Sequence, residues 1–428
     1  WNSCLPESKW RPGKAAGQQG KTVSDVSYFR CKRIETGMEI SMRACLTLLA
    51  FTLLATPLQA QEAAAPSAEA PPRTVLEALR PFYGQLELDH PTAGPSASRD
   101  PALALTRIAF GSCHDPEREG MEILERVAAD NPDLFIYTGD NVYGDAWSFD
   151  ATLPELRAAY AALAAATEFQ TLRAQTPMLA VWDDHDYGMN DFGRGFPFKE
   201  YAERLFLDFW NVPEDDERRQ RDGIYASRVY GPEGQRTQII LLDTRYFRSD
   251  LTPTPERGAE GRERYIPSGA DNQDMLGETQ WAWLEDQLSV PADLRLVVSS
   301  IQVHADGHGW EAWRTLPQER ARFYNLLEET GAGGVILMSG DRHSSGIYVR
   351  EDVIGYPLYE ITSSSLNMSF QEENSESGPH RIGDMYAPVN YGVIDVNWAE
   401  RFVNLQIRDA DGRAVRDVAI SLEDLAPR

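Results

Sequence analysis

The chain has 428 residues and a formal net charge of −25 at pH 7, with 66 acidic and 41 basic residues. This length allows one large domain or two ordinary ones. The charge excludes a protein that depends on attraction to nucleic acid or to an anionic membrane surface. It also has the wrong sign for attracting phosphate, unless bound cations invert the local field.

The N-terminal region contains a signal-peptide pattern that does not lie at the start of the chain. Residues 1–41 show no hydrophobic periodicity, and "MRACLTLLAFTLLATPLQA" begins at Met42. One Arg, an apolar run and a small-residue end predict a secretory signal peptide over 42–60, cleaved after Ala60. We therefore expect a periplasmic or extracellular protein without a stable membrane anchor. Residues 1–41 are interpreted as non-native sequence translated upstream of the true start; a cytoplasmic extension on a membrane anchor is the alternative.

Residues 61–105 are predicted to be an Ala/Pro/Glu-rich linker and a short N-terminal segment, with one helix over 73–89. Three of the four cysteines precede Ala60, so Cys113 would be alone after cleavage. A single cysteine forms no internal disulfide. Cys113 is therefore a ligand, a nucleophile or an inert core residue.

From Thr106 onward, short apolar runs alternate with amphipathic ones. The predicted strands are 106–113, 133–140, 178–186, 237–245, 294–302, 334–341 and 358–365. The predicted helices are 117–129, 153–174, 198–211, 278–289 and 317–331. The tail is expected to be a three-stranded antiparallel meander with an Asp-Gly turn. This order indicates one layered α/β domain over 106–428.

Polar side chains follow several of these strands. The groups are Ser112-Cys113-His114, Gly139-Asp140, Asp183-Asp184-His185-Asp186 and Gly340-Asp341-Arg342-His343. Ligands bind at the carboxyl ends of strands in α/β sheets. A carboxylate at the end of a buried run, such as Asp140 after "LFIYTG", needs compensation, and a cation supplies it.

The donor types indicate which cations fit. A thiol, imidazoles and a phenol together suit iron or zinc better than magnesium alone. The phenol of Tyr143 has an ordinary pKa of about 10, so it favours a trivalent ion such as Fe(III).

Four motifs carry a family resemblance: "AFGSC", "YTGDNVYGD", "VWDDHDYGMND" and "MSGDRHSSGIY". Together they resemble the PhoD-like (alkaline phosphatase D) branch of the calcineurin-like metallophosphoesterases. "GETQWAWLEDQL" and "HGWEAWRTLPQERARFYNLL" are also similar to that branch, so the resemblance covers roughly residues 106–410. It implies a four-layer α/β/β/α sandwich whose two mixed sheets hold a metal cluster at their strand ends.

The resemblance also implies the ligands. Asp140 would bridge two ions, and Cys113 and Tyr143 would bind Fe(III). Asp184 would replace the Asn usual in the wider superfamily, and Asn190 would complete the shell of a Ca²⁺ ion. Further metal ligands would be Asp341 and His343.

Two features depart from the family. Larger members carry an N-terminal β-sandwich domain, for which the stretch between Gln61 and Thr106 is too short. The sequence therefore does not predict how substrate reaches the site. His304 lies near the position of a superfamily metal ligand, and the sequence favours neither a ligand nor an ordinary loop residue; His308 stays equally open.

The implied reaction is hydrolysis of phosphate esters by a metal-activated water. His185 would protonate the leaving alkoxide, and Arg342 would clamp the phosphoryl group; a metal-bound or ligand-orienting His185 and a structural salt bridge of Arg342 are the alternatives. The sequence leaves open phosphomonoesters against phosphodiesters, and also the oligomeric state. Two other function classes are a non-haem iron oxygenase and a non-catalytic surface protein stabilised by calcium or iron.

Overall fold

The structure, a computed structural model, describes residues 74–370 and 378–427. These residues belong to one compact unit that begins at Pro71. The predicted upstream segment 1–41 and the predicted signal peptide 42–60 lie outside the described residues. Within the described ranges, none of the helices has the length and apolar character that crossing a bilayer requires.

The first sheet has six strands in the order β15-β14-β13-β1-β2-β3. Its parallel half consists of β1 (Arg107–Gly111), β2 (Leu134–Thr138) and β3 (Met178–Val181). Its antiparallel half is the predicted meander, formed by β13 (Asn390–Asn397), β14 (Phe402–Asp409) and β15 (Ala414–Ser421). The parallel half brings the carboxyl ends of three strands to one edge.

The second sheet has seven strands in the order β12-β10-β11-β9-β8-β5-β4. Its parallel centre is β5 (Thr237–Leu241), β8 (Leu294–Val298), β9 (Val335–Ser339) and β11 (Leu358–Thr362). Antiparallel neighbours are β4 (Ala226–Tyr230), β10 (Ser345–Arg350) and β12 (Arg381–Tyr386). A separate hairpin joins β6 (Thr252–Pro253) to β7 (Tyr265–Ile266).

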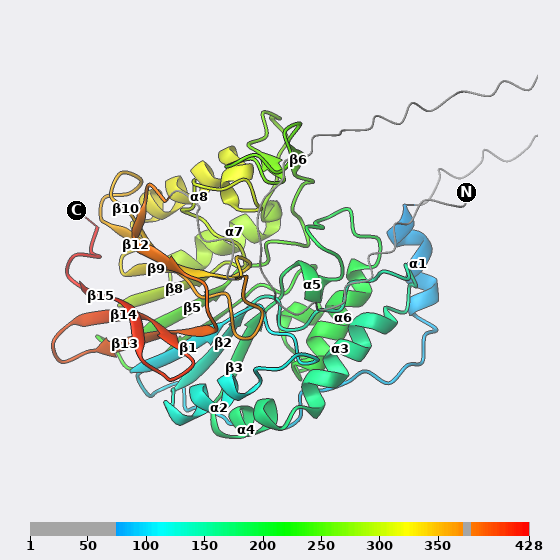
Figure 1. Cartoon of the computed structure of the whole chain (residues 1–428), viewed down its shortest axis with the longest axis horizontal. Coiled ribbons are helices and arrows are strands. Elements are labelled where there is room, and N and C mark those ends of the chain that lie inside the picture. Colours follow the sequence, from blue (N-terminus) through cyan, green and yellow to red (C-terminus); the bar gives the residue numbers. More distant parts are fainter. Residues whose placement is uncertain (1–73, 371–377, 428) are drawn as a thin grey trace, which may run out of the picture. The chain divides into compact units, whose positions relative to one another are not determined.

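Helices cover the outer sides of both sheets. In Figure 1, α2 (Glu122–Ala129) and α4 (Thr167–Gln175) lie beside the first sheet, and α7 (Gly277–Leu288) and α8 (Pro317–Thr330) lie beside the second. Every residue of β2, β5, β8 and β9 is buried, as expected for strands covered on both faces. The predicted four-layer α/β/β/α sandwich with two mixed sheets is therefore confirmed.

Four helices remain among the described residues. These are α1 (Val75–Tyr83), α3 (Pro154–Ala165), α5 (Asp184–Tyr187) and α6 (Lys199–Phe209), with short 3₁₀ turns at Glu217–Arg219 and Trp313–Thr315. The ring of Tyr83 stacks on Tyr201 of α6 at 5.0 Å, and the backbone N–H of Ala93 donates to Phe209. The described part of the predicted linker therefore packs on the domain.

Two predicted elements differ from the observed ones, and three observed strands had no predicted counterpart. The single helix predicted over 153–174 is two helices, because Ala166 adopts an extended conformation between α3 and α4. The strand predicted over 178–186 ends at Val181, because Asp183 is the N-cap residue of α5 and its backbone N–H donates to Oδ1 of Asp186 at 2.5 Å. Strands β4, β10 and β12 were not predicted, since their polar residues interrupt the apolar pattern.

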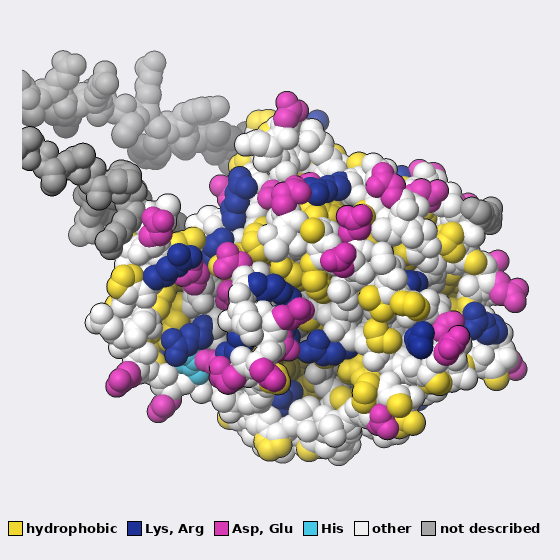
Figure 2. Space-filling model, turned by 180° about the vertical axis from the view of Figure 1, so that it is seen from behind, with side chains coloured by type: hydrophobic (Ala, Val, Ile, Leu, Met, Phe, Trp, Pro, Cys, Tyr) yellow, Lys and Arg dark blue, Asp and Glu magenta, His cyan; other side chains and the backbone are white. Residues whose placement is uncertain are grey.

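The surface carries charges of both signs. On the face in Figure 2, Lys and Arg side chains lie interspersed with Asp and Glu side chains. Ion pairs such as Arg80–Glu200, at 2.7 Å, join α1 to α6. Such exposed pairs contribute little individually, about 0–1 kcal/mol, so the buried sheets dominate the stability.

Glu203 of α6 should make the fold sensitive to alkaline pH. Burial, with Asp243 nearby, raises its pKa to about 9. A carboxyl group whose pKa rises on folding contributes full stability below its pKa in the unfolded chain, about 4.3, and loses that contribution as pH rises towards 9. For Glu203→Gln, the melting temperature relative to wild type should increase by about 4 °C between pH 5 and pH 9, measured by circular dichroism. Glu329→Gln, at an exposed site on α8, is the control, and an unchanged difference for Glu203→Gln would contradict the prediction.

Candidate metal centre

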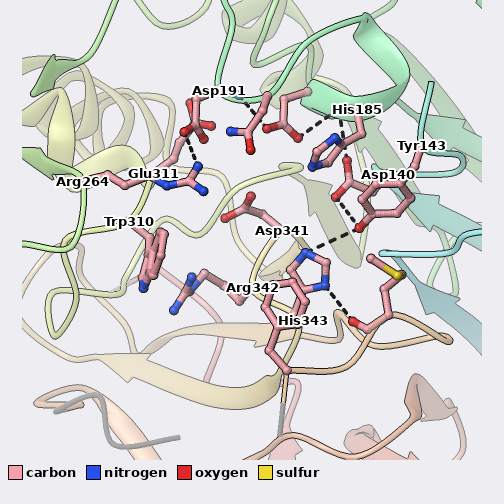
Figure 3. A pocket seen from close by; sticks show the side chains of 14 residues that line it. Asp140, Tyr143, His185, Asp191, Arg264, Trp310, Glu311, Asp341, Arg342 and His343 are labelled. Carbon is pink, nitrogen blue, oxygen red and sulfur yellow. Dashed lines mark hydrogen bonds and ion pairs between the residues drawn. The ribbon is translucent and has the colours of Figure 1, made fainter. Parts of the chain in front are cut away.

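A pocket of about 360 Å³ lies where strand ends of the two sheets meet (Figure 3). Eight of the nine residues predicted for the site line it: Asp140, Tyr143, Asp184, His185, Asn190, Asp341, Arg342 and His343. The ninth, Cys113, is fully buried, and its Sγ lies 3.5 Å from Oδ2 of Asp140. The structure therefore brings all nine residues to one place.

Four of these residues have a left-handed backbone. The φ angle is +54° at Cys113, +46° at Asp140, +69° at Asp341 and +50° at His343. Non-glycine residues rarely adopt this conformation, which costs on the order of 1–3 kcal/mol each and concentrates at functional sites. The chain therefore turns sharply after β1, β2 and β9, and these turns direct the side chains toward the pocket.

Glycines before two of the aspartates permit close packing at the strand ends. A Cβ atom at Gly139 would lie 2.6 Å from Cβ of Asp183, and one at Gly340 would lie 2.4 Å from Oγ of Ser112. Neither distance is tolerated between such atoms. In each Gly-Asp pair, the glycine therefore allows the close packing, and the aspartate that follows lies in the turn that directs its side chain toward the pocket.

The first cluster combines a thiol, a phenol, an imidazole and a carboxylate. The Tyr143 hydroxyl donates to Oδ2 of Asp140 at 3.2 Å and lies 3.5 Å from Nε2 of His343. Nδ1 of His343 lies 2.7 Å from the carbonyl oxygen of Met368, which can only accept. Nδ1 therefore carries the proton, and Nε2 presents its lone pair to the cluster.

Burial controls ionisation in this cluster. Burial, followed by the charge of Asp140, raises the pKa of the Cys113 thiol and of the Tyr143 phenol. Burial lowers the pKa of His343 to about 4. The protein alone therefore keeps all three groups neutral, and a cation among them would favour loss of the thiol and phenol protons.

The second cluster is acidic. Carboxylate oxygens of Asp183, Asp184 and Asp341 lie within 4.8 Å of one another, and Asp140 and Asp184 form a similar group with His185. Burial, with the neighbouring aspartates, raises the pKa of Asp341. Asp140 belongs to both clusters, so it lies between two places where a cation fits.

The third group occupies the opposite wall. Asp191 and Glu311 lie within 4.8 Å of Asp184. Asp191 pairs with Arg264 and accepts from the hydroxyl of Tyr265 at 2.8 Å, so its charge is already compensated. It serves chiefly to hold Arg264 at the pocket.

A buried ion network lies beneath the pocket. Arg245, which follows β5 in the second sheet, donates to Asp183, which follows β3 in the first sheet, at 2.6 Å. Arg245 also pairs with Glu311 at 2.6 Å, and Arg248 pairs with Glu311 at 3.0 Å. These four side chains are at most 1% exposed. The network therefore ties the two sheets together at the metal end.

His185 lies at the junction of the clusters. Its Nδ1 is 2.7 Å from Oδ2 of Asp145, and its ring packs against Tyr143 with centroids 4.4 Å apart. Burial would lower its pKa, but Asp184 and Asp140 raise it well above the ordinary value. The pairing with Asp145 leaves Nε2 as the second ring nitrogen for contacts in the pocket.

The structure places three residues whose roles the sequence left open. Arg342 lines the pocket, because the strand ends at Ser339 and alternation of side chains no longer applies. Both ring nitrogens of His304 have protein partners, the hydroxyl of Tyr324 at 2.9 Å and the carbonyl of Leu358 at 3.1 Å. His304 is absent from the pocket lining. His308 is buried, and its Nε2 lies 3.0 Å from Oε1 of Gln302.

The donors present fit metal ions. Oδ2 of Asp183 is buried and has no hydrogen-bond partner among the described residues. The cluster with the thiol and phenol suits an iron-type ion, whereas the carboxylates suit a harder ion such as Ca²⁺. Like charges buried this closely repel one another, and cations remove that repulsion.

Several residues of the site were not expected from the sequence. Asp183, Asp191, Arg245 and Glu311 were not predicted as part of it. Arg245 belongs to Asp243-Thr244-Arg245, a polar group that follows a buried strand, so the criterion used for Asp140 would have found it. Asp191 and Glu311 lie in loops without a periodic pattern, but both belong to segments that carry the family resemblance, "VWDDHDYGMND" and "HGWEAWRTLPQERARFYNLL", which was the available signal.

Two mixed sheets with a carboxylate-rich pocket at their strand ends define a metallophosphatase-type sandwich. The chain belongs to the PhoD-like phosphatase family, whose model matches residues 108–406. Alkaline phosphatase D of Bacillus subtilis (strain 168) is 22% identical over 278 residues, which cover 56% of this chain and 46% of the relative. The match therefore spans less than half the length of that curated relative.

One solved structure supports the same fold, and a second shows a weaker likeness. The structure of PhoD has a TM-score of 0.55 and 16% identity, and the match covers 77% of this chain and 70% of that chain. GAP50, described as the anchor in the inner membrane complex of Plasmodium, has a TM-score of 0.49 and 12% identity over 76% of this chain and 90% of its own.

Replacing Asp140 tests whether the two clusters share it. Asp140→Ala should lose most of the bound metal, and its melting temperature should fall in metal but not in chelator, because the variant lacks a carboxylate that repels Asp184. Metal analysis and thermal unfolding with and without chelator measure both effects. Asp384→Ala, at an exposed site on β12, is the control. An Asp140→Ala protein that retains its full metal content would refute a shared ligand.

Proposed function

We propose that the protein is a metal-dependent phosphoric ester hydrolase, acting on phosphomonoesters, phosphodiesters or both. The observation that carries this proposal is the shared position of Asp140. It lies within 4.8 Å of donors in two clusters, one with Cys113 and His343 and one with Asp184 and His185. Two cations at one carboxylate are the arrangement that hydrolytic two-metal sites use on phosphate esters.

The chain's donors divide between two kinds of ion. Cys113, Tyr143, His343 and Asp140 would hold Fe(III). Asp184, Asn190 and Asp341 would hold Ca²⁺, with Asp140 shared. When bound, the ions supply Lewis-acid activation of water and neutralise charge on the phosphoryl oxygens. Family membership and the donor clusters support metal dependence; the choice of iron and calcium rests on the donor types.

Two side chains act on the substrate directly. Arg342 binds a non-bridging oxygen of the phosphoryl group, since a guanidinium matches phosphate geometry. His185 donates the proton from Nε2 to the leaving oxygen, while Asp145 holds Nδ1 at 2.7 Å and fixes the ring. The substrate is a small phosphate ester, and the leader-like pattern over 42–60 supports action outside the cytoplasm.

The iron assignment predicts a coloured protein. Thiolate and phenolate both donate charge to Fe(III), so the native enzyme should show a visible absorption band and contain iron and calcium. Cys113→Ser should shift that band, retain less iron and lose activity at least tenfold, on the order of what disturbed metal sites lose. Tyr143→Phe should remove most of the remaining colour.

Metal exchange provides the control for this assignment. After prolonged chelation, iron plus calcium should restore hydrolysis of p-nitrophenyl phosphate better than zinc does. Full recovery with zinc alone, or Cys113→Ser with full iron and full activity, would overturn the assignment. A metal-loaded protein that hydrolyses neither this ester nor its bis-ester would be the non-catalytic alternative.

The proton-donor role of His185 predicts a dependence on the leaving group. His185→Asn should slow hydrolysis of an alkyl phosphate by about 10²–10⁴-fold, because an alkoxide needs a proton to leave. Hydrolysis of p-nitrophenyl phosphate should slow far less, because nitrophenolate leaves without one. Steady-state kinetics on both esters measure the contrast. Asp145→Asn, which only disturbs the orientation of the His185 ring, should give a smaller loss that is again larger for the alkyl phosphate. Equal losses on both esters in His185→Asn would contradict the proton-donor role.

A further inference from the structure

The pocket has two chemically different walls. The clusters described above form one wall. The other contains Arg264, Trp310 and Arg342, which we call the tryptophan wall (Figure 3). Metal binding and phosphoryl binding require only the first wall and one cation. The indole of Trp310 is therefore a pocket-lining group that the proposed reaction leaves without a role.

The pocket is larger than a phosphoryl group requires. Its volume of about 360 Å³ lies within the range of about 300–1,000 Å³ of pockets that hold small-molecule ligands. A phosphate has five heavy atoms, and two metal ions add little volume. Space therefore remains for part of the alcohol group of the substrate, and the tryptophan wall borders that space.

Two guanidinium groups fix the electrostatics of this wall. The Arg264 guanidinium lies 4.8 Å from the centroid of the Trp310 ring, and that of Arg342 lies 5.9 Å from it. Arg264 is held by Asp191. These cation–π contacts place positive charge next to a flat apolar surface, which suits an aromatic group joined to an anion.

The backbone around Trp310 is held from both sides. The carbonyl oxygen of Gly309 accepts from the backbone N–H of Tyr265, in β7, at 2.7 Å, and the N–H of Trp310 donates to Nδ1 of His308 at 3.1 Å. A Cβ atom at Gly309 would lie 2.5 Å from the backbone N of Glu263, so the two segments pack without a gap. Trp310 is therefore presented by a rigid segment, as recognition of a flat ring requires.

We propose that the tryptophan wall binds a flat aromatic ring in the alcohol part of the phosphate ester, and so sets the substrate preference of the pocket. This inference rests on the proposed phosphoric ester hydrolysis. The ring contacts the indole of Trp310, while Arg342 reaches the phosphoryl group next to it. A simple aryl group and a nucleobase share the required chemistry, and the experiment separates them.

The test compares esters that differ in their alcohol. In Trp310→Ala, kcat/KM for phenyl phosphate should fall about 5–100-fold, the usual cost of removing an aromatic stacking partner. The value for ethyl phosphate should stay within about twofold of wild type. Each ester is compared with itself in the two proteins, so the better leaving group of the aryl ester cancels. Thymidine 5′-phosphate is the third substrate, and a fall larger than that for phenyl phosphate assigns the wall to a nucleobase.

Binding without turnover gives an independent measurement. Calorimetry on the metal-loaded protein should show that Trp310→Ala weakens phenylphosphonate but not methylphosphonate, and Trp310→Phe should restore most of the lost affinity. Phe82→Ala, an exposed aromatic of α1, is the matched control. Equal effects on the two phosphonates, or on phenyl and ethyl phosphate, overturn this inference alone. A wild-type protein that hydrolyses no ester and binds no phosphonate overturns the proposed function with it.

Discussion

The ion pair between Arg245 and Asp183 is the contact that the metal end of this fold depends on. Arg245 belongs to the second sheet and Asp183 to the first, and both are fully buried. A buried charge without a partner is very costly, so separating the Arg245 and Asp183 side chains is strongly unfavourable. The pair therefore fixes the spacing of the two sheets where the strand ends meet.

The same ion network uses two arginines below the pocket and leaves the carboxylates around the pocket with less positive charge beside them. Arg245 and Arg248 compensate Asp183 and Glu311, whereas Asp140, Asp184 and Asp341 gather around the pocket with fewer cationic partners. A chain with a net charge of −25 can bring an anionic ester to such a place only through added cations. Arg264 and Arg342 add positive charge along one wall, so the two walls of the pocket differ in charge.

The sequence was sufficient for the parts of the site that adjoin regular strands. Apolar runs before Cys113, Asp140 and Asp341 predicted both the strand and the side chain that follows it, because a buried strand end exposes its polar residues at a sheet edge. The two mixed sheets followed from the family resemblance. Arg342 follows the end of β9 at Ser339 and lines the pocket, as its expected contact with a phosphoryl group requires.

Loop residues could not be predicted in the same way. Asp191, Glu311 and Trp310 lie in segments without hydrophobic periodicity, and their meeting depends on contacts over long sequence separations, such as Arg264 with Asp191. The sequence over 153–174 predicted a single helix because no Gly or Pro marks a break at Ala166, whereas the structure has an extended residue there. Such features arise from tertiary packing, which overrides weak local preferences.

The left-handed backbone at Cys113, Asp140, Asp341 and His343 has a consequence for the order of assembly. These conformations are unfavourable in isolation, and the surrounding sheets impose them. The turns that carry the ligands are therefore set by folding of the polypeptide itself, before any ion is present. A bound ion would then require little further ordering of these turns, and it would displace the protons of its ligands.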